Sequence, residues 1–116
     1  MDRVEVEAVE DRSRADGGHA VILLRGVMGA PTELRFRLRL VEADGLAPDT
    51  AGVLGVDLKP DAISATGDGL ALTIGPAIAC SPALIPGAAI EITLPDIRVS
   101  GEFLWPAVSP QARPKR

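Results

Sequence analysis

The sequence predicts a single small antiparallel β-sandwich or β-barrel of about seven or eight strands. Apolar and polar residues alternate in most of its apolar segments, and this period of two places side chains on opposite faces of a strand. Short turns rich in glycine, proline and aspartate separate these segments, and no long amphipathic helix is evident. The chain has 116 residues, the size of one domain. We expect residues 1–106 to form it and residues 107–116 to be a basic, proline-rich extended tail.

Three strands are expected in the N-terminal part of the chain. Valine and alanine alternate with glutamate over Val4–Ala8, which is the pattern of a half-buried strand. Ala20–Leu24 is a continuous apolar run, typical of a more deeply buried strand. In Leu34–Leu40, apolar residues alternate with three arginines. A helix would scatter these arginines around its circumference, so this segment is the clearest strand.

Four further strands are expected in the second half of the chain, and the first and last of them are interrupted by a glycine. They are Val53–Leu58, Leu70–Ile74, Ile90–Leu94 and Ile97–Trp105. A proline and an aspartate lie between the last two, so a hairpin tip is expected at residues 94–97. The longest polar connection, residues 44–52, is expected to be a mobile loop.

Residues 69–90 contain no charged residue, and a stretch of this length would nominally cross a bilayer. Its prolines break any helix through the stretch, so we expect no membrane insertion. We expect a buried strand followed by a proline-rich crossover over the core. Apolar residues that the core does not cover would favour contact with another subunit or protein. The candidate interface residues are Ile78, Leu84, Ile85 and Trp105, the last as an exposed anchor or, with more weight, as a cap on the core.

Charge and composition argue against several classes of function. The formal net charge of −4 disfavours general nucleic-acid binding, which requires a concentrated basic surface. Only three aromatic residues are present, which leaves few platforms for stacking bases or sugars. Cys80 is the only cysteine, so the chain forms no internal disulfide. The acidic, alternating N-terminal segment is unlike a secretory signal, and we expect a cytoplasmic location.

Catalytic patterns are also missing from the sequence. His19 is the only histidine, and Cys80 would need it alongside as a base to act as a nucleophile. Neither residue has the spacing of a known metal site. The serines lack a G-x-S-x-G setting, and no phosphate-binding G-x-x-x-x-G-K loop occurs. We therefore expect no enzymatic activity, no catalytic residue, no metal and no cofactor.

The strongest local feature is the arginine ladder, which consists of Arg35, Arg37 and Arg39. On a strand these side chains project from one face at intervals of about 6–7 Å. One interpretation is a cationic site for a phosphate, a nucleotide or an acidic polymer. The favoured interpretation is structural, with the ladder paired across strands to Glu5, Glu7 and Glu10, which offer acids at the same spacing.

Two motifs carry a resemblance to a known family. Ala62–Gly67, which reads A-I-S-A-T-G, is similar to the D-x-S-x-x-G motif of PilZ domains, small β-barrels that bind cyclic di-GMP. Arg35 and Arg39 satisfy the R-x-x-x-R motif of that family upstream. A strand and a closing hairpin strand follow, so the resemblance extends over residues 35–105.

The resemblance implies both a fold and a ligand site. It implies that the arginines grip guanine and phosphate groups, and that Ser64 and Gly67 contribute further ligand contacts. Ala62 stands where the motif has aspartate, which removes a carboxylate. The chain therefore resembles a degenerate PilZ-like barrel.

From these observations we expect a non-enzymatic all-β binding or assembly module that acts through protein–protein contacts. The contacts would involve the proline-rich crossover and exposed strand edges, with a protein partner or a second copy of the chain. A homo-oligomer or a subunit of a bacterial or viral assembly fits this expectation. The alternative is a PilZ-like domain that binds a cyclic dinucleotide or another small anionic ligand through the arginine ladder, Ser64 and Gly67.

Overall fold

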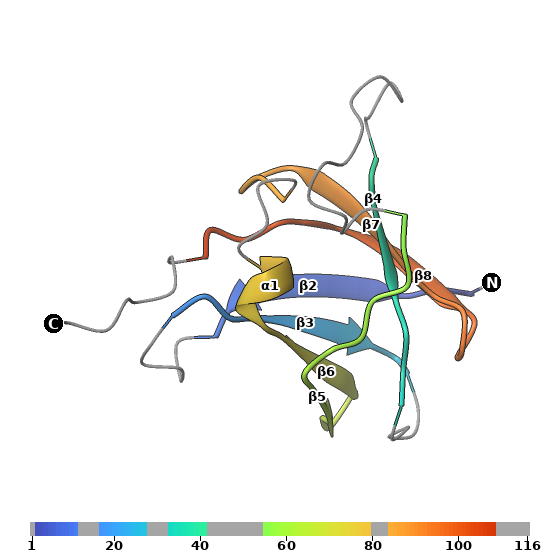
Figure 1. Cartoon of the computed structure of the whole chain (residues 1–116). Helices are drawn as coiled ribbons and strands as arrows, with labels where there is room; N and C mark the ends of the chain where they lie inside the picture. The colour runs from blue at the N-terminus through green and yellow to red at the C-terminus, as the bar shows by residue number, and fades with distance from the viewer. Residues whose placement is uncertain (1, 12–16, 28–32, 42–54, 80–83, 109–116) are drawn as a thin grey trace, which may run out of the picture.

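The computed structural model describes residues 2–11, 17–27, 33–41, 55–79 and 84–108. Within these ranges the chain forms two four-stranded sheets that pack face to face (Figure 1). The only helix among the described residues is a single turn, α1, Pro76–Ala79. The prediction of a small all-β, sandwich-like fold is confirmed.

The first sheet has the strand order β1-β8-β7-β4. Its strands are β1 (Asp2–Arg3), β8 (Val99–Leu104), β7 (Ala89–Leu94) and β4 (Arg37–Leu40). The short β1 runs parallel to β8, and the other neighbours are antiparallel. The first sheet therefore contains the arginine ladder strand at one edge and the N-terminal segment at the other.

The second sheet has the order β2-β3-β6-β5 and is antiparallel throughout. Its strands are β2 (Glu5–Glu10), β3 (Ala20–Arg25), β6 (Gly69–Ile74) and β5 (Ala62–Ala65). Of these, β5 was not expected as a strand, because the segment is only four residues long and shows no apolar alternation. Its residues are mostly exposed. Its backbone pairing with β6, and not its side chains, makes it a strand.

Inward-facing side chains from both sheets meet in one apolar core. Ile22 and Leu72 from the second sheet and Phe36 and Ile92 from the first have no solvent exposure. Complete burial of such a side chain contributes about 1.5–3 kcal/mol to the free energy of folding. The period-two alternation in the sequence therefore identified the core face of the strands correctly.

The N-terminal segment crosses from the first sheet to the second. The Val4 N–H donates to the Ser100 carbonyl of β8 (2.9 Å), and from Glu5 onward the chain pairs with β3. This crossing passes directly over Gly101, where a Cβ atom would lie 2.7 Å from the Val4 carbonyl oxygen and would overlap the Val6 side chain. A glycine is needed there because the backbones approach so closely.

A second crossing joins the opposite edges of the sheets. Phe36 in the first sheet exchanges backbone hydrogen bonds with Leu58 (2.9 and 2.8 Å), and the Asp61 N–H then donates to Thr73 in the second (2.7 Å). The expected strand Val53–Leu58 is therefore wrong over its described part, because residues 55–58 make one isolated bridge. Gly55 has a φ of 74° there, which interrupts an extended strand.

The predicted hairpin tip is confirmed, because β7 and β8 are joined by a turn over residues 95–98. Ile97 lies in this turn, and its N–H donates to the Leu94 carbonyl (3.3 Å). The last strand therefore begins at Val99, later than expected. The turn has Arg98 in the left-handed region with a φ of 56°, which a continuous strand from Ile97 would not allow.

The uncharged stretch forms β6, the helical turn α1 and the start of β7. Across the described ranges, no helix is long and apolar enough to span a membrane. Three expectations lie outside the described residues: the loop at 44–52, the thiol of Cys80 and the tail beyond residue 108.

Two glycines, Gly67 in the β5–β6 turn and Gly69 at the start of β6, give a direct test of this packing. A Cβ atom on Gly69 would overlap the main-chain carbonyl oxygen of Leu24 in the neighbouring strand, whereas one on Gly67 meets nothing within 4 Å. We expect Gly69→Ala to lower the free energy of unfolding by about 2–3 kcal/mol. Gly67→Ala, the matched control, should change it by less than about 0.5 kcal/mol. Urea denaturation of both variants measures this, and equal effects would contradict the register of β3 and β6.

Candidate functional site

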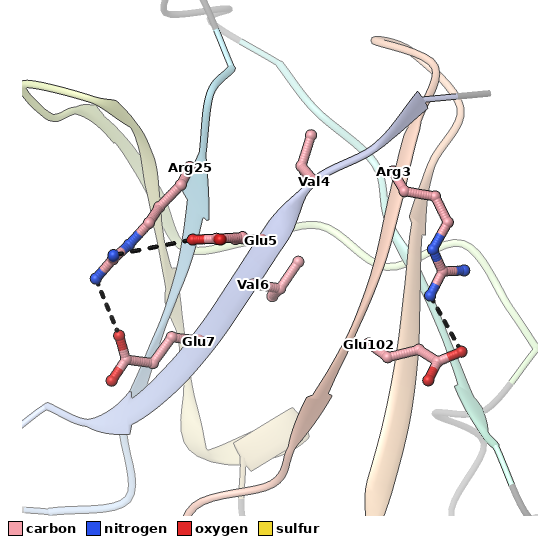
Figure 2. Close-up of a pocket in the computed structure, with 7 residues that line it drawn as sticks. All are labelled: Arg3, Val4, Glu5, Val6, Glu7, Arg25 and Glu102. Carbon is pink, nitrogen blue, oxygen red and sulfur yellow. Dashed lines mark hydrogen bonds and ion pairs between the residues drawn. The ribbon is translucent and has the colours of Figure 1, made fainter.

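A groove lies beside the N-terminal crossing, between β2 and β8 (Figure 2). Its volume is about 450 Å³. Val4 and Val6 of the N-terminal segment contribute apolar side chains to it. Its remaining lining is charged and comprises Arg3, Glu5, Glu7, Arg25 and Glu102. The groove combines a small apolar surface with two strand edges and charged side chains.

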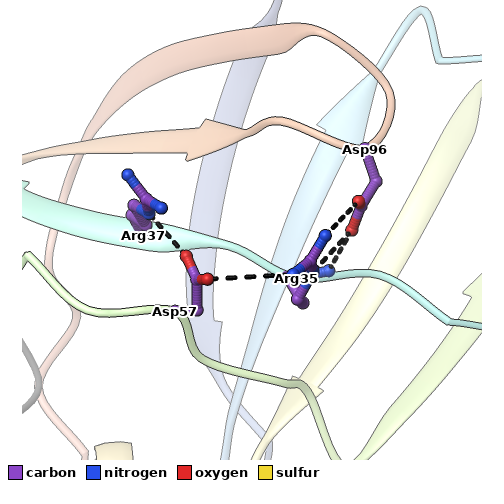
Figure 3. A network of polar contacts seen from close by, with 4 residues as sticks. All are labelled: Arg35, Arg37, Asp57 and Asp96. Carbon is purple, nitrogen blue, oxygen red and sulfur yellow. Dashed lines mark hydrogen bonds and ion pairs between the residues drawn. The ribbon is translucent and has the colours of Figure 1, made fainter.

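The first two arginines of the ladder belong to an alternating network of charges on the first sheet (Figure 3). The Arg35 guanidinium donates to Asp96 (3.0 Å), and the Arg35 backbone N–H also donates to that carboxylate (2.9 Å). Asp57 lies between the two arginines: it accepts a hydrogen bond from Arg37 and is 3.8 Å from Arg35. The four side chains follow one another in space as Arg37, Asp57, Arg35 and Asp96. Each guanidinium therefore has a carboxylate beside it that balances its charge.

These contacts change the proton affinities of the groups involved. Hydrogen bonding from Arg37 lowers the pKa of Asp57, and hydrogen bonding from Arg35 lowers the pKa of Asp96. The same hydrogen bonds raise the pKa of the two guanidinium groups. All four side chains are solvent-exposed, so the network is a surface feature with modest energy.

Arg39 belongs to a separate network on the same sheet. Its guanidinium donates to Glu91 of β7 (2.6 Å). Arg3 of β1 lies 3.7 Å from Glu91 and 3.2 Å from Glu102 of β8. The outer face of the first sheet therefore carries a row of charged side chains from all four of its strands, with two glutamates between two arginines.

The interpretation that the ladder pairs with acids is right in kind, but the expected partners are wrong. Glu5 and Glu7 lie beside Arg25 at 4.0 and 3.4 Å. They are on β2 in the second sheet, whereas the ladder is on β4 and the residues just before it in the first, where the neighbour of β4 is β7. Equal spacing of acids and bases in the sequence does not specify which strands are adjacent.

The two motifs behind the resemblance lie in different sheets. Ser64 is an exposed residue of β5, at the edge of the second sheet, and Gly67 is in the turn that follows. Of the arginine ladder, Arg37 and Arg39 lie on β4, at an edge of the first sheet, and Arg35 lies two residues before it. The described contacts of the ladder are with Asp57, Asp96 and Glu91. The structure therefore brings the arginines together with acids and places Ser64 on the neighbouring sheet.

Three of the four candidate interface residues are covered within the chain. Leu84 and Trp105 are buried in the core, and Ile78 is half-buried and packs against it. The Trp105 ring centroid lies 5.9 Å from that of Phe103, as expected for a cap on the core. Only Ile85 presents most of its side chain to solvent, with 62% exposed.

Sequence reasoning missed a second exposed apolar feature, which we call the apolar row: Val41, Ala89 and Leu104. The Val41 N–H donates to the Ala89 carbonyl (3.0 Å), and Ala89 is paired with Leu104, which is 64% exposed. Ile85 is nearby, because its carbonyl accepts from Ala88 and the Ala88 carbonyl accepts from the residue after Leu104. The detectable signal was Leu104 itself, an apolar residue at a polar position of the alternation.

The remaining candidates for chemistry do not assemble into a site in the described part of the chain. His19 is half-buried and its Nδ1 is 2.9 Å from the Gly17 carbonyl oxygen. No group of three histidine, cysteine, aspartate or glutamate side chains in the described ranges is arranged to hold a metal ion.

Comparison with known protein families, curated proteins and solved structures finds no match to this chain.

The charge network predicts a pH-dependent contribution to stability. The pKa of Asp57 and Asp96 is lowered below the ordinary value of 3.8 in the folded state. Their stabilising contribution is therefore complete above that value and is lost as the pH falls through the lowered pKa. We expect the double variant Asp57→Asn, Asp96→Asn to melt at a lower temperature than the original chain at about pH 6, with the difference shrinking toward about pH 2.

Thermal melts by circular dichroism across this pH range measure the effect. Asp68→Asn, in the β5–β6 turn of the other sheet, controls for the loss of a surface carboxylate. A difference in melting temperature that stays constant with pH would show that ionisation of the two carboxyl groups is not its source.

Proposed function

We propose that this chain is a non-enzymatic protein-binding module that uses the apolar row and Ile85 as its contact surface. The observation that carries the proposal is the exposure of Ile85 and Leu104, at 62% and 64%, at the same end of the β7–β8 hairpin. Isolated exposed apolar residues are common on protein surfaces. A contiguous group on a rigid sheet is instead typical of an interaction site.

The surroundings of the apolar row support this proposal. The neighbouring row across the same strands consists of Arg39, Glu91 and Glu102, which are in register with one another. An apolar centre beside charged residues is the usual composition of an interface core and its polar rim. Ala89 and Leu104 lie on paired strands, and the Val41 N–H is hydrogen-bonded to Ala89, so little backbone order has to be gained on binding.

The alternative proposal, a cyclic dinucleotide or another anionic ligand on the arginine ladder, has less support. Each arginine of the ladder already has a carboxylate partner. Asp96 lies 3.0 Å from Arg35, Glu91 lies 2.6 Å from Arg39, and Asp57 accepts a hydrogen bond from Arg37. An anion would have to displace Asp57, Asp96 or Glu91, and these carboxylates oppose its approach by charge repulsion.

A charge placed in the apolar row tests the leading proposal. We take a second copy of the chain as the first partner to examine, by light scattering on size-exclusion eluate over a wide concentration range at low and high salt. We expect an oligomer that survives high salt, because apolar contacts are not screened. Leu104→Glu should weaken its association by about tenfold or more by burying a charge in the contact.

Val9→Glu is the matched control, because Val9 is a 40% exposed valine of β2 in the other sheet. It should leave the association unchanged. A chain that is monomeric at every concentration would contradict assembly between copies, and equal effects of the two variants would remove the apolar row as the contact surface.

The alternative is tested by titration with cyclic di-GMP and with inorganic phosphate. If the ladder binds anions, replacing Arg35 and Arg39 by alanine should lower affinity by about tenfold or more, since each loses a charge-assisted contact. Binding that is absent, or equal in the original chain and the double variant, removes the anionic-ligand proposal.

A further inference from the structure

We propose that the outer edge of β5 pairs with the same edge of a second copy of the chain, so that the second sheets of the two copies join into one continuous antiparallel sheet. This edge is separate from the apolar row, and the proposal does not rest on that row. Four observations carry the inference: the direction of the backbone groups of β5, the space beside them, the side chains that flank them and the absence of charge along the strand.

The even-numbered residues of β5 direct their backbone groups toward β6. The Thr66 N–H donates to the Gly69 carbonyl (2.8 Å), and these two residues continue the register that pairs β5 with β6. Hydrogen-bonded pairs recur at every second residue of an antiparallel ladder, so the even-numbered residues of β5 bond to β6. The N–H and carbonyl groups of Ile63 and Ala65 therefore point out of the edge of the sheet.

The other side of β6 supports the same assignment. The Gly26 N–H donates to the Asp68 carbonyl (2.6 Å), which continues the pairing of β3 with β6. Even-numbered residues of β6 therefore bond to β3 and odd-numbered ones to β5. These odd-numbered residues lie opposite the even-numbered residues of β5. In the described part of the chain, no backbone hydrogen bond outside the β5–β6 ladder involves Ile63 or Ala65.

The space beside this edge is open with respect to the described residues. β5 is the last strand of the second sheet, and its neighbour in that sheet is β6 (Figure 1). Ala65 is exposed, and Ile63 is half-buried against the core. A Cβ atom on Gly67, in the turn that follows β5, would meet nothing within 4 Å. A strand can therefore approach the edge without displacing any of these residues.

The edge of β5 is complementary to itself when two copies run antiparallel about a twofold axis at Ser64. Ile63 of each copy then lies opposite Ala65 of the other, and each such pair exchanges two backbone hydrogen bonds. On the inner face of the sheet, each Ile63 side chain packs beside the exposed Ala65 of the other copy. On the outer face, the two Ser64 hydroxyl groups lie next to each other and can share a hydrogen bond.

The charges near β5 are compatible with this pairing. Residues 62–67 carry no charge, so no like charges meet along the paired strands. Antiparallel pairing brings the turn that contains Asp68 toward the end of the other copy that contains Lys59 and Asp61. The Asp61 carboxylate lies against Gly75 of its own chain. Lys59 is exposed and has no carboxylate within ion-pair distance among the described residues, so it is available to Asp68 of the second copy.

The other strand edges of the described structure are covered or charged. Residues 55–58 lie along β4, where Phe36 is bridged to Leu58. The N-terminal segment lies against β8 at Gly101, and β1 consists of two charged residues. The edge of β5 is therefore the uncharged edge that the described structure leaves open, and a second copy supplies its complement. Such an edge is a known site of strand pairing between chains.

The test uses the Leu104→Glu chain, in which the apolar row is blocked, so that failure of the function proposed above and failure of this proposal are distinguishable. Sedimentation velocity over a wide concentration range should show a monomer–dimer equilibrium. Adding Ser64→Lys or Ser64→Glu should raise the dissociation constant by about tenfold or more, because two like charges then meet at the twofold axis. An equal mixture of these two variants should regain the dimer, since a lysine then faces a glutamate.

Val9→Lys and Val9→Glu are the matched controls. Val9 is 40% exposed and lies on β2, at the opposite edge of the same sheet. In the Leu104→Glu chain, both controls should dimerise within about twofold of their parent, separately and mixed.

Amide hydrogen exchange, followed by NMR on the same chain, tests the backbone contact. The amides of Ile63 and Ala65 should exchange about tenfold or more slowly when the concentration is raised above the dissociation constant, because both become hydrogen-bonded in the dimer. The Ala8 amide, on β2 at the opposite edge, should exchange at the same rate at every concentration.

Melting curves identify a variant that has failed to fold. If either Ser64 variant fails, Ala65→Pro takes its place, because it removes an outward N–H and leaves the bonds to β6 intact, with Ala65→Val as its control. The proposal is overturned if the Leu104→Glu chain is monomeric at every concentration, if the Ser64 variants dimerise as tightly as the Val9 variants, if their mixture stays monomeric, or if exchange at Ile63 and Ala65 does not depend on concentration.

Discussion

The two crossings of the main chain between the sheets are the constraint on which the other features depend. The N-terminal segment pairs first with β8 and then with β3, and residues 55–65 contact first β4 and then β6. The N-terminal crossing requires a glycine, because a Cβ on Gly101 would lie 2.7 Å from the Val4 carbonyl oxygen and would overlap the Val6 side chain. At the other crossing, the Asp61 carboxylate lies against Gly75. With both crossings in place, the apolar faces of the two sheets close around a single core.

The crossings also determine where the charges of the first sheet find partners. Residues 55–58 lie along β4, and this brings Asp57 between Arg35 and Arg37. The N-terminal segment lies along β8, and this brings Arg3 to Glu91 and Glu102. The arginine ladder, which looks cationic in the sequence, is consequently neutralised in the folded chain. All of these acid partners lie far from their arginines along the chain.

The N-terminal crossing creates the groove as well. Because the segment changes sheets after Val4, charged side chains of β2 and β8 gather beside the crossing and line the groove. The apolar row has a different origin. It forms where the alternation of β8 places Leu104 outward, next to Ala89 and Val41. The chain thus presents two distinct surfaces, a flat apolar one on a sheet face and a charged one beside the N-terminal crossing.

The sequence by itself determined the fold class, most of the strands and the identity of the core, because side-chain alternation is a local property that each strand records independently. The alternation alone predicts that Phe36 and Leu72 belong to the core, and both are buried. Trp105 caps the core, as expected from its position at the end of the last alternating segment. Strand adjacency depends instead on how distant segments meet. It decided that the ladder contacts Asp57, Asp96 and Glu91 and not Glu5 and Glu7, that Leu84 is covered, and that a groove opens between β2 and β8. No local pattern encodes these pairings, since one alternating strand is compatible with many neighbours and only the closing of the core selects among them.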